Sequence, residues 1–228
     1  MMSYKSLLLD IDGVLVRDTR LQNKISSRCA KYTASKLPDV DDPVGLTQSL
    51  YLQYGHTALG LQKCFGIDTS DFNDAVYTKD VLIDLQKFLK SDIFVNDAEY
   101  IKDFIYRGWE VNLFSNTPDS YQWRVASAIH DLVGCSPIGT SGSNRKLKPD
   151  PLAYTYFPTH KTHVFVDDSS LNLKVAQNLP NWYPIHFCPI QCEIGFPSIS
   201  SILDLSNLIS EIDDTIDPVR SSSIKNKC

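Results

Sequence analysis

Apolar residues along this chain form two kinds of pattern: short continuous runs and longer stretches with helical spacing. Continuous runs of strand length cover residues 5–9, 111–114, 163–166 and 182–187. Such runs are typical of strands buried on both faces of a parallel sheet. Helical spacing precedes the second run, with Asn96 as the predicted N-cap and Gly108 after the helix, and it returns around residues 171–179. The alternation predicts an α/β fold with a doubly wound parallel sheet.

The segment between the first two runs differs, because its apolar residues keep helical spacing throughout. We predict that residues 18–91 form an α-helical cap, inserted into an α/β core made of residues 1–17 and 92–212. The last residues, 213–228, are polar and are predicted to form a flexible tail.

Composition and charge narrow the classes of partner. The chain is 43% hydrophobic and 21% charged, as in ordinary globular proteins. Its net charge is −5 and its Lys and Arg residues are not clustered, which argues against binding of nucleic acid. The first apolar run is interrupted by Asp10 and Asp12, so it predicts neither a signal peptide nor a membrane span. The six cysteines are scattered, which favours reduced thiols. We expect a cytoplasmic protein that does not bind membranes; an additional nuclear location and the oligomeric state stay open.

Polar residues follow three of the predicted strands directly. They are Asp10 and Asp12, Ser115 and Asn116, and Asp167 and Asp168. The carboxyl ends of parallel strands meet at one edge of the sheet, where ligands bind in folds of this class. Like charges about 4 Å apart repel by about 4 kcal/mol at an effective dielectric constant of about 20, so clustered acids require a cation. An all-oxygen set of ligands without His or Cys favours Mg²⁺.

The same residues predict chemistry on a phosphate ester. A carboxylate can attack phosphorus if other groups neutralise the phosphoryl oxygens and an acid protonates the leaving oxygen. Asp10 is the candidate nucleophile, and Asp12 is the candidate acid and later base. Ser115 can donate its hydroxyl to the phosphoryl group, and Lys148 can supply positive charge, with Lys146 as a nearby rival.

Taken in order, these motifs resemble the four motifs of the haloacid dehalogenase superfamily. The stretch DIDGVL at 10–15 resembles the first motif, Ser115 the second, Lys148-Pro149 the third and the acid pair at 167–168 the fourth. The resemblance implies a role for each residue: Asp10 as nucleophile and metal ligand, Asp12 as acid and base with its backbone carbonyl on Mg²⁺, Ser115, Asn116 and Lys148 on the phosphoryl group, and Asp167 and Asp168 as metal ligands. Asn172 resembles a supporting member of the same site.

Part of the predicted cap carries a finer resemblance. Residues 50–61, LYLQYGHTALGL, resemble the LYxxYGxTxxGL stretch of the pyrimidine 5'-nucleotidase-like subgroup. This resemblance implies hydrolysis of nucleoside 5'-monophosphates under a helical cap. Tyr51, Tyr54 and His56 are candidates for contact with the substrate, but aromatic residues at helical spacing equally predict packing. Gly55 and Gly60 predict either close packing or a helix break near the substrate.

Other functions stay open at this point. A phosphatase or phosphomutase acting on a sugar phosphate would use the same groups. A dehalogenase is disfavoured by Asp12, because a halide leaves without a proton and without magnesium. Separately, Asp10 and Asp12 could form a solvated turn and the acid pair at 167–168 a helix cap. A catalytically silent binding protein of the same fold is the alternative from outside the enzymes.

Overall fold

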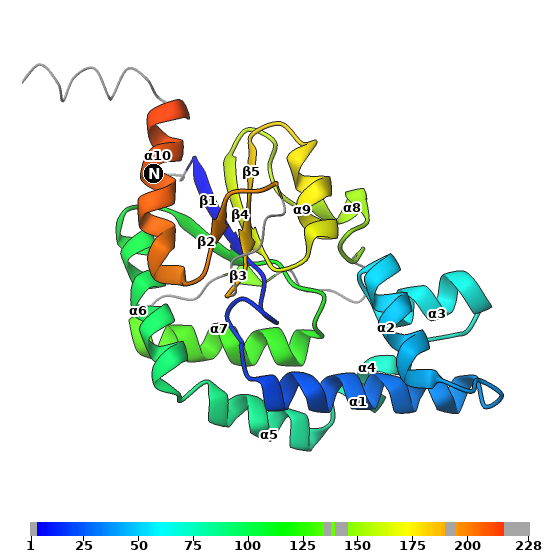
Figure 1. Cartoon of the computed structure of the whole chain (residues 1–228). Coiled ribbons are helices and arrows are strands. Elements are labelled where there is room, and N and C mark those ends of the chain that lie inside the picture. Colours follow the sequence, from blue (N-terminus) through cyan, green and yellow to red (C-terminus); the bar gives the residue numbers. More distant parts are fainter. Residues whose placement is uncertain (1–3, 135–137, 140–145, 190–194, 217–228) are drawn as a thin grey trace, which may run out of the picture.

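The computed structural model describes residues 4–134, 138–139, 146–189 and 195–216. Within these residues, six parallel strands form one sheet in the order β3-β2-β1-β4-β5-β6 (Figure 1). The strands are β1 (Lys5–Leu9), β2 (Glu110–Leu113), β3 (Ile138–Gly139), β4 (Thr162–Asp167), β5 (Trp182–Phe187) and β6 (Ser198–Ile199). The predicted α/β fold with a parallel sheet is confirmed.

The three central strands β2, β1 and β4 end within one residue of one another. Leu9 at the end of β1 is in register with Leu113 of β2 on one side and with Val166 of β4 on the other. All three side chains are buried. Because the strands are parallel and level, the residues that follow them emerge at one edge of the sheet.

Helices cover both faces of this sheet. On one side lie α6 (Asp92–Tyr106), α7 (Asp119–Val133), the 3₁₀ turn η1 (Ile202–Asp204) and α10 (Leu205–Ile216), and on the other lie α8 (Pro151–Tyr154) and α9 (Ser170–Gln177). Side chains of β1 alternate between the two resulting cores, with Leu7 and Leu9 in the first and Leu8 in the second. The sheet is therefore doubly wound, as predicted.

The start of α6 was predicted wrongly. Its N-cap is Ser91, whose Oγ accepts a hydrogen bond from the backbone N–H of Phe94 at 3.4 Å, and Asn96 lies inside the helix. At the other end of the chain, residues 213–216 of the predicted tail belong to α10, and residues 217–228 lie outside the described part of the chain.

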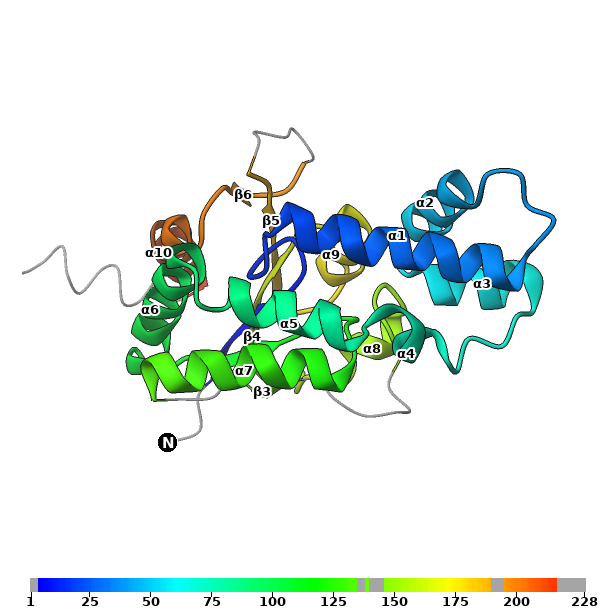
Figure 2. The same ribbon diagram turned by 90° about the horizontal axis from the view of Figure 1, so that it is seen from below.

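Six helices come between β1 and β2, and the first five of them form a segment that we call the insert. They are α1 (Thr19–Lys36), α2 (Pro43–Tyr54), α3 (Thr57–Phe65), α4 (Phe72–Val76) and α5 (Lys79–Phe88). The insert has a small core of its own, here the insert core, formed by Tyr32, Leu50, Ala58, Leu61, Phe72 and Val76. Figure 2 shows α1 running from beside the sheet to the far end of the insert. Its Leu21 belongs to the core that contains Leu7 and Leu9, here the main core, and its Tyr32 belongs to the insert core.

Three of the six cysteines lie in the part of the chain that the structure describes. The prediction of reduced thiols is confirmed for Cys29 and Cys64, which are free, and is wrong for Cys188, which is disulfide-bonded. Among the described residues, no helix combines the length and the apolar character that crossing a membrane requires.

Candidate active site

The loop that follows β1 places the first two acids. Asp10 is buried, and its Oδ1 accepts a hydrogen bond from the backbone N–H of Ile11 at 2.7 Å. The chain then turns, and the N–H of Val16 donates to the carbonyl of Ile11 at 2.8 Å. Gly13 has a φ of +83°, and a Cβ at this position would lie 2.1 Å from Oδ2 of Asp168. Only glycine allows this turn and the close approach of that carboxylate.

Three carboxylates meet at the edge of the sheet, and we call them the acid cluster. Asp10, Asp167 and Asp168 each offer one oxygen, and these oxygens lie within 4.8 Å of one another. Asp167 is fully buried, and its Oδ1 accepts hydrogen bonds from the N–H of Ser169 at 2.8 Å and from Nδ2 of Asn172 at 3.0 Å. The carboxylate oxygens fit a hard divalent cation such as Mg²⁺, whose charge would offset their mutual repulsion.

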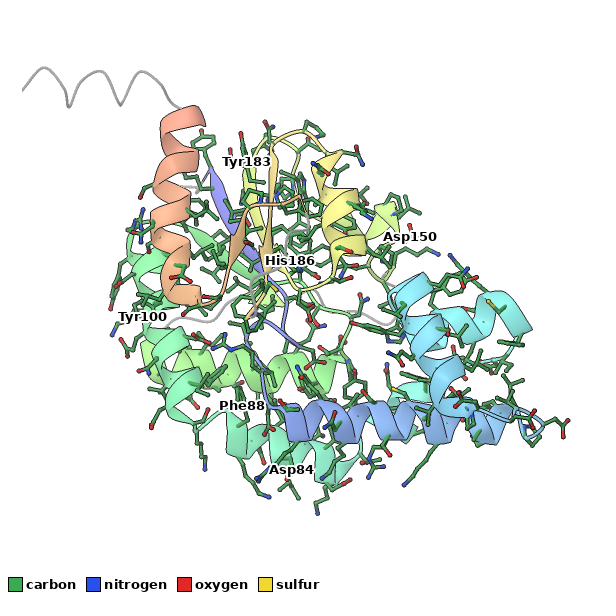
Figure 3. All side chains as sticks on the ribbon, in the orientation of Figure 1. Asp84, Phe88, Tyr100, Asp150, Tyr183 and His186 are labelled. Carbon is green, nitrogen blue, oxygen red and sulfur yellow. The ribbon has the colours of Figure 1, made fainter. Side chains whose placement is uncertain are left out.

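The backbone of Asp168 is held from the next strand. His186 of β5, labelled in Figure 3, is buried, and its Nε2 lies 3.1 Å from the carbonyl oxygen of Asp168. This contact requires the tautomer with the proton on Nε2. The Asp168 residue itself is exposed. Its backbone is therefore fixed while its carboxylate remains accessible to a ligand.

Lys148 supplies the positive charge inside the cluster. Its side chain is 1% exposed, and its Nζ lies 2.5 Å from Oδ2 of Asp167 and 3.2 Å from Oδ1 of Asp10. Burial lowers the pKa of Lys148, but the charges of Asp10 and Asp167 outweigh it and raise this pKa above its usual value. Its rival Lys146 is exposed, and its backbone N–H donates to Tyr156 Oη at 2.8 Å. Lys148 is thus the lysine that contacts the acids.

Asn116 fixes the backbone of that lysine. Its Oδ1 accepts from the N–H of Lys148, and its Nδ2 donates to the carbonyl of Lys148, both at 2.8 Å. The side-chain amide therefore holds in place the turn at Lys148, here the lysine turn. The contact of Asn116 with a phosphoryl group stays a prediction. This paired contact could not be predicted from the sequence, because the two residues are far apart in the chain.

Ser115 lies at the same edge of the sheet. The residue before it, Phe114, donates its N–H to the carbonyl of Leu9 at 2.8 Å, which joins the end of β2 to the end of β1. Ser115 is 3% exposed, and its Oγ accepts from the N–H of Thr117 at 3.3 Å. The carbonyl of Ser115 accepts from Nε2 of Gln122 at 3.2 Å. These bonds tie the loop after β2 to the start of α7.

Asp12 has a partner that the sequence reading missed. Tyr121 of α7 is fully buried, and its Oη donates a hydrogen bond to Oδ1 of Asp12 at 2.9 Å. Burial, and after it the negative charge of Asp10, raise the pKa of Asp12 to about 7. A carboxyl group with such a pKa can both donate and accept a proton near neutral pH. Its position in the sequence shows only that Tyr121 is one of several residues on the buried face of its helix.

Comparison with known proteins gives a fold but no close relative. No protein-family model matches the sequence, and no curated protein matches it. A HAD phosphatase from Thermococcus onnurineus superposes with a TM-score of 0.57 at 15% identity, over 90% of this chain and 97% of that one. The chain has a haloacid dehalogenase-like fold.

Other solved structures with this haloacid dehalogenase-like fold differ in what they bind. The L-2-haloacid dehalogenase of Xanthobacter autotrophicus, with chloropropionic acid covalently bound, has a TM-score of 0.52 at 11% identity, over 90% of this chain and 98% of that one. The putative HAD-hydrolase YfnB of Bacillus subtilis, bound to magnesium, has a TM-score of 0.52 at 16% identity, over 91% and 99%. At such identities the likeness shows the fold, and function has to be argued from the site.

Of the three candidate aromatic residues in the insert of this haloacid dehalogenase-like fold, one has a pKa that the acids affect. Tyr51 of α2 is 49% exposed, and desolvation of its phenol, followed by the charges of Asp168 and Asp10, raises its pKa. The charges of the acid cluster therefore act on this phenol. The other two contact the insert itself: Oη of Tyr54 accepts from Sγ of Cys64 at 3.1 Å, and the ring of His56 lies 5.3 Å from that of Phe72.

Two of the glycines in the insert, Gly55 and Gly60, are required by different close contacts. Gly55 ends α2 with a φ of +71°, and a Cβ there would lie 2.7 Å from Cδ of Pro149, next to the lysine turn. A Cβ on Gly60 would lie 2.8 Å from Cβ of Leu50, where α3 packs on α2. Both glycines serve close packing, and only Gly55 does so against the loop that carries Lys148.

Proposed function

We propose that this protein is a magnesium-dependent phosphohydrolase that cleaves small phosphate monoesters through an aspartyl-phosphate on Asp10. The observation that carries the proposal is the position of Asp10, which lies within the acid cluster and 3.2 Å from Nζ of Lys148. A carboxylate beside a cation site and a buried lysine is suited to attack a phosphoryl group whose charge those neighbours neutralise.

Each step can be assigned to a side chain. An oxygen of Asp10 attacks phosphorus, the bond from phosphorus to the ester oxygen breaks, and Asp12 gives its proton to the leaving alkoxide. A water molecule then attacks phosphorus, loses its proton to Asp12, and releases phosphate and the free carboxylate of Asp10. Mg²⁺ held by the acid cluster would supply Lewis-acid neutralisation of the phosphoryl oxygens. Ser115 and Lys148 hold the phosphoryl group during both steps.

Asp12 favours phosphate transfer over dehalogenation. A halide departs as a stable anion and needs no acid, whereas an alkoxide leaves poorly without a proton. The pKa of about 7 for Asp12 gives a group that can supply this proton near neutral pH. The acid group of Asp12 therefore separates the proposed reaction from that of the dehalogenase with the same fold.

We propose nucleoside 5'-monophosphates as the substrates, with Tyr51 in contact with the nucleoside. The support is the LYxxYGxTxxGL-like stretch at 50–61, together with the effect of the charges of Asp168 and Asp10 on the pKa of Tyr51. An aromatic ring beside the phosphate site can stack on a base. The side chains of Tyr54 and His56 support the shape of the insert through the contacts described above.

The test is phosphate release from nucleoside monophosphates, sugar phosphates and p-nitrophenyl phosphate, with Mg²⁺ and with EDTA. We expect release only with Mg²⁺, fastest from a nucleoside monophosphate, and a loss of at least about 1000-fold in Asp10→Asn. Asp39→Asn, at an exposed acid, is the control and should keep wild-type rates. No release from any ester by the folded protein with Mg²⁺ would refute the proposal and favour a silent binding protein.

A further inference from the structure

We propose that Tyr121 is a positioning residue for the reaction, and that it holds Asp12 so that one carboxyl oxygen faces the leaving group. This inference rests on the proposed phosphohydrolase function. Its basis is the hydrogen bond from Tyr121 Oη to Asp12 Oδ1 at 2.9 Å. Within the described residues, this buried hydroxyl has no other hydrogen-bond partner. The hydroxyl is therefore satisfied by the carboxyl group of Asp12.

The tyrosine is itself held in place. Its ring is fully buried, and the ring of Tyr77 packs edge-on against it with centroids 5.5 Å apart. Its neighbour Gln122 donates from Nε2 to the carbonyls of Ser115 at 3.2 Å and Thr117 at 2.8 Å. The start of α7 is therefore tied to the same loop that carries the predicted phosphate-binding serine, which fixes the phenol relative to the site.

The hydrogen bond has a directional consequence for Asp12. Without it, the carboxyl group could rotate about its terminal bond, which has a broad energy profile. With Oδ1 accepting from the phenol, Oδ2 is the oxygen left to exchange a proton, and among the described residues no donor contacts it. Proton transfer requires the acid within hydrogen-bond reach of the leaving oxygen. A misplaced carboxyl group would slow that transfer without weakening the nucleophile.

A purely structural tyrosine and a positioning tyrosine can be told apart by the leaving group. An alkoxide needs the proton of Asp12, whereas p-nitrophenolate departs without it. Loss of positioning therefore affects alkyl esters and spares the aryl ester, but general damage to the fold affects both. The value to compare is kcat/KM, because it reports the first step, in which the ester oxygen leaves, and not the later release of phosphate.

The decisive experiment uses Tyr121→Phe, which removes only the hydroxyl. We expect kcat/KM for a nucleoside 5'-monophosphate to fall by about 10-fold, while that for p-nitrophenyl phosphate changes by less than about 2-fold. Asp12→Asn should show the same selectivity with a larger fall. An equal fall for both esters in Tyr121→Phe, or no fall in either, would overturn the inference.

Tyr32→Phe is the matched control. Tyr32 is also buried, and its Oη donates to an aspartate, Oδ1 of Asp71, at 2.5 Å, but it lies in the insert core. We expect this variant to leave the ratio of the two kcat/KM values unchanged; a changed ratio would mean that general loosening produces the effect, and would overturn the inference. A wild-type protein that hydrolyses neither ester would refute the proposed function and this inference together, whereas an active wild type with an unselective Tyr121→Phe would refute this inference alone.

Discussion

The edge of the sheet that holds the acid cluster, here the acid edge, and the insert core each contain a buried tyrosine that donates to an aspartate. The pKa values of the two aspartates are shifted in opposite directions. Beside Tyr121, burial and the charge of Asp10 raise the pKa of Asp12 to about 7. In the insert, the hydrogen bonds from Tyr32 and Lys36 lower the pKa of Asp71. The hydrogen bond is the same in kind, so desolvation and neighbouring charge decide whether the aspartate holds its proton. One pair suits proton transfer and the other suits a permanently ionised contact.

Replacing each of these aspartates in turn should give the largest difference between the two regions. Asp12→Asn loses the acid, so we expect kcat/KM for an alkyl phosphate to fall by about 100- to 10,000-fold. Asp71→Asn should leave the same value within about 2-fold of wild type, since Asp71 lies in the insert, away from the acid cluster. Initial rates of phosphate release measure both. A comparable loss in the two variants would mean that the contrast in pKa has no bearing on catalysis.

Metal removal should affect the acid edge and spare the insert core. Binding of Mg²⁺ to the folded state alone should stabilise it by about 2.7 kcal/mol at a concentration of 100 times Kd. We therefore expect Tm to rise with Mg²⁺ and to fall again with EDTA. Asp167→Asn, which removes one member of the acid cluster, should lose most of this rise, and Asp71→Asn should keep it. Differential scanning calorimetry provides the measurement, and a rise that survives Asp167→Asn would place the metal elsewhere.

The contact between the two regions can be broken at one glycine. Gly55 and Gly66 both have positive φ, but only Gly55 would bring a Cβ against Pro149, since no atom lies within 4 Å of a Cβ on Gly66. Ala at Gly66 should cost about 1 kcal/mol of unfolding free energy from the backbone alone. Gly55→Ala should cost more, and should raise KM because α2 must move away from the lysine turn. Urea unfolding and steady-state kinetics test this, and equal results for the two variants would count against it.

The smallest expected effect is a pH dependence of stability that arises from Asp71. Its pKa is lowered in the folded state, so the folded protein binds its proton less readily than the unfolded chain. The stabilisation is therefore present above the unfolded pKa of about 4 and is lost as the pH falls through the lower folded value. The difference in Tm between wild type and Asp71→Asn should shrink from about pH 6 to about pH 3. A difference that stays constant with pH would mean that the charge of Asp71 has no role.

The sequence predicted the candidate site best where acidic residues follow the ends of strands. The apolar runs located the four longest strands, and their parallel order required that the acids after the strands at 5–9 and 162–167 meet. The two-residue strands β3 and β6 were out of reach, because so few residues show no period. Tyr121 was missed because helical spacing tells which face of α7 is buried and not where a phenol hydroxyl ends. The paired bonds of Asn116 to Lys148 depend on two loops that only the folded sheet brings together.

The course of α1 has a consequence for how the protein melts. This helix of 18 residues, about 27 Å long, places Leu21 in the main core and Tyr32 in the insert core. Loss of either core would leave one half of the helix without the packing that stabilises it, and short helices are marginal in water on their own. The two cores should therefore unfold cooperatively, as a single calorimetric transition whose van't Hoff enthalpy matches its measured heat.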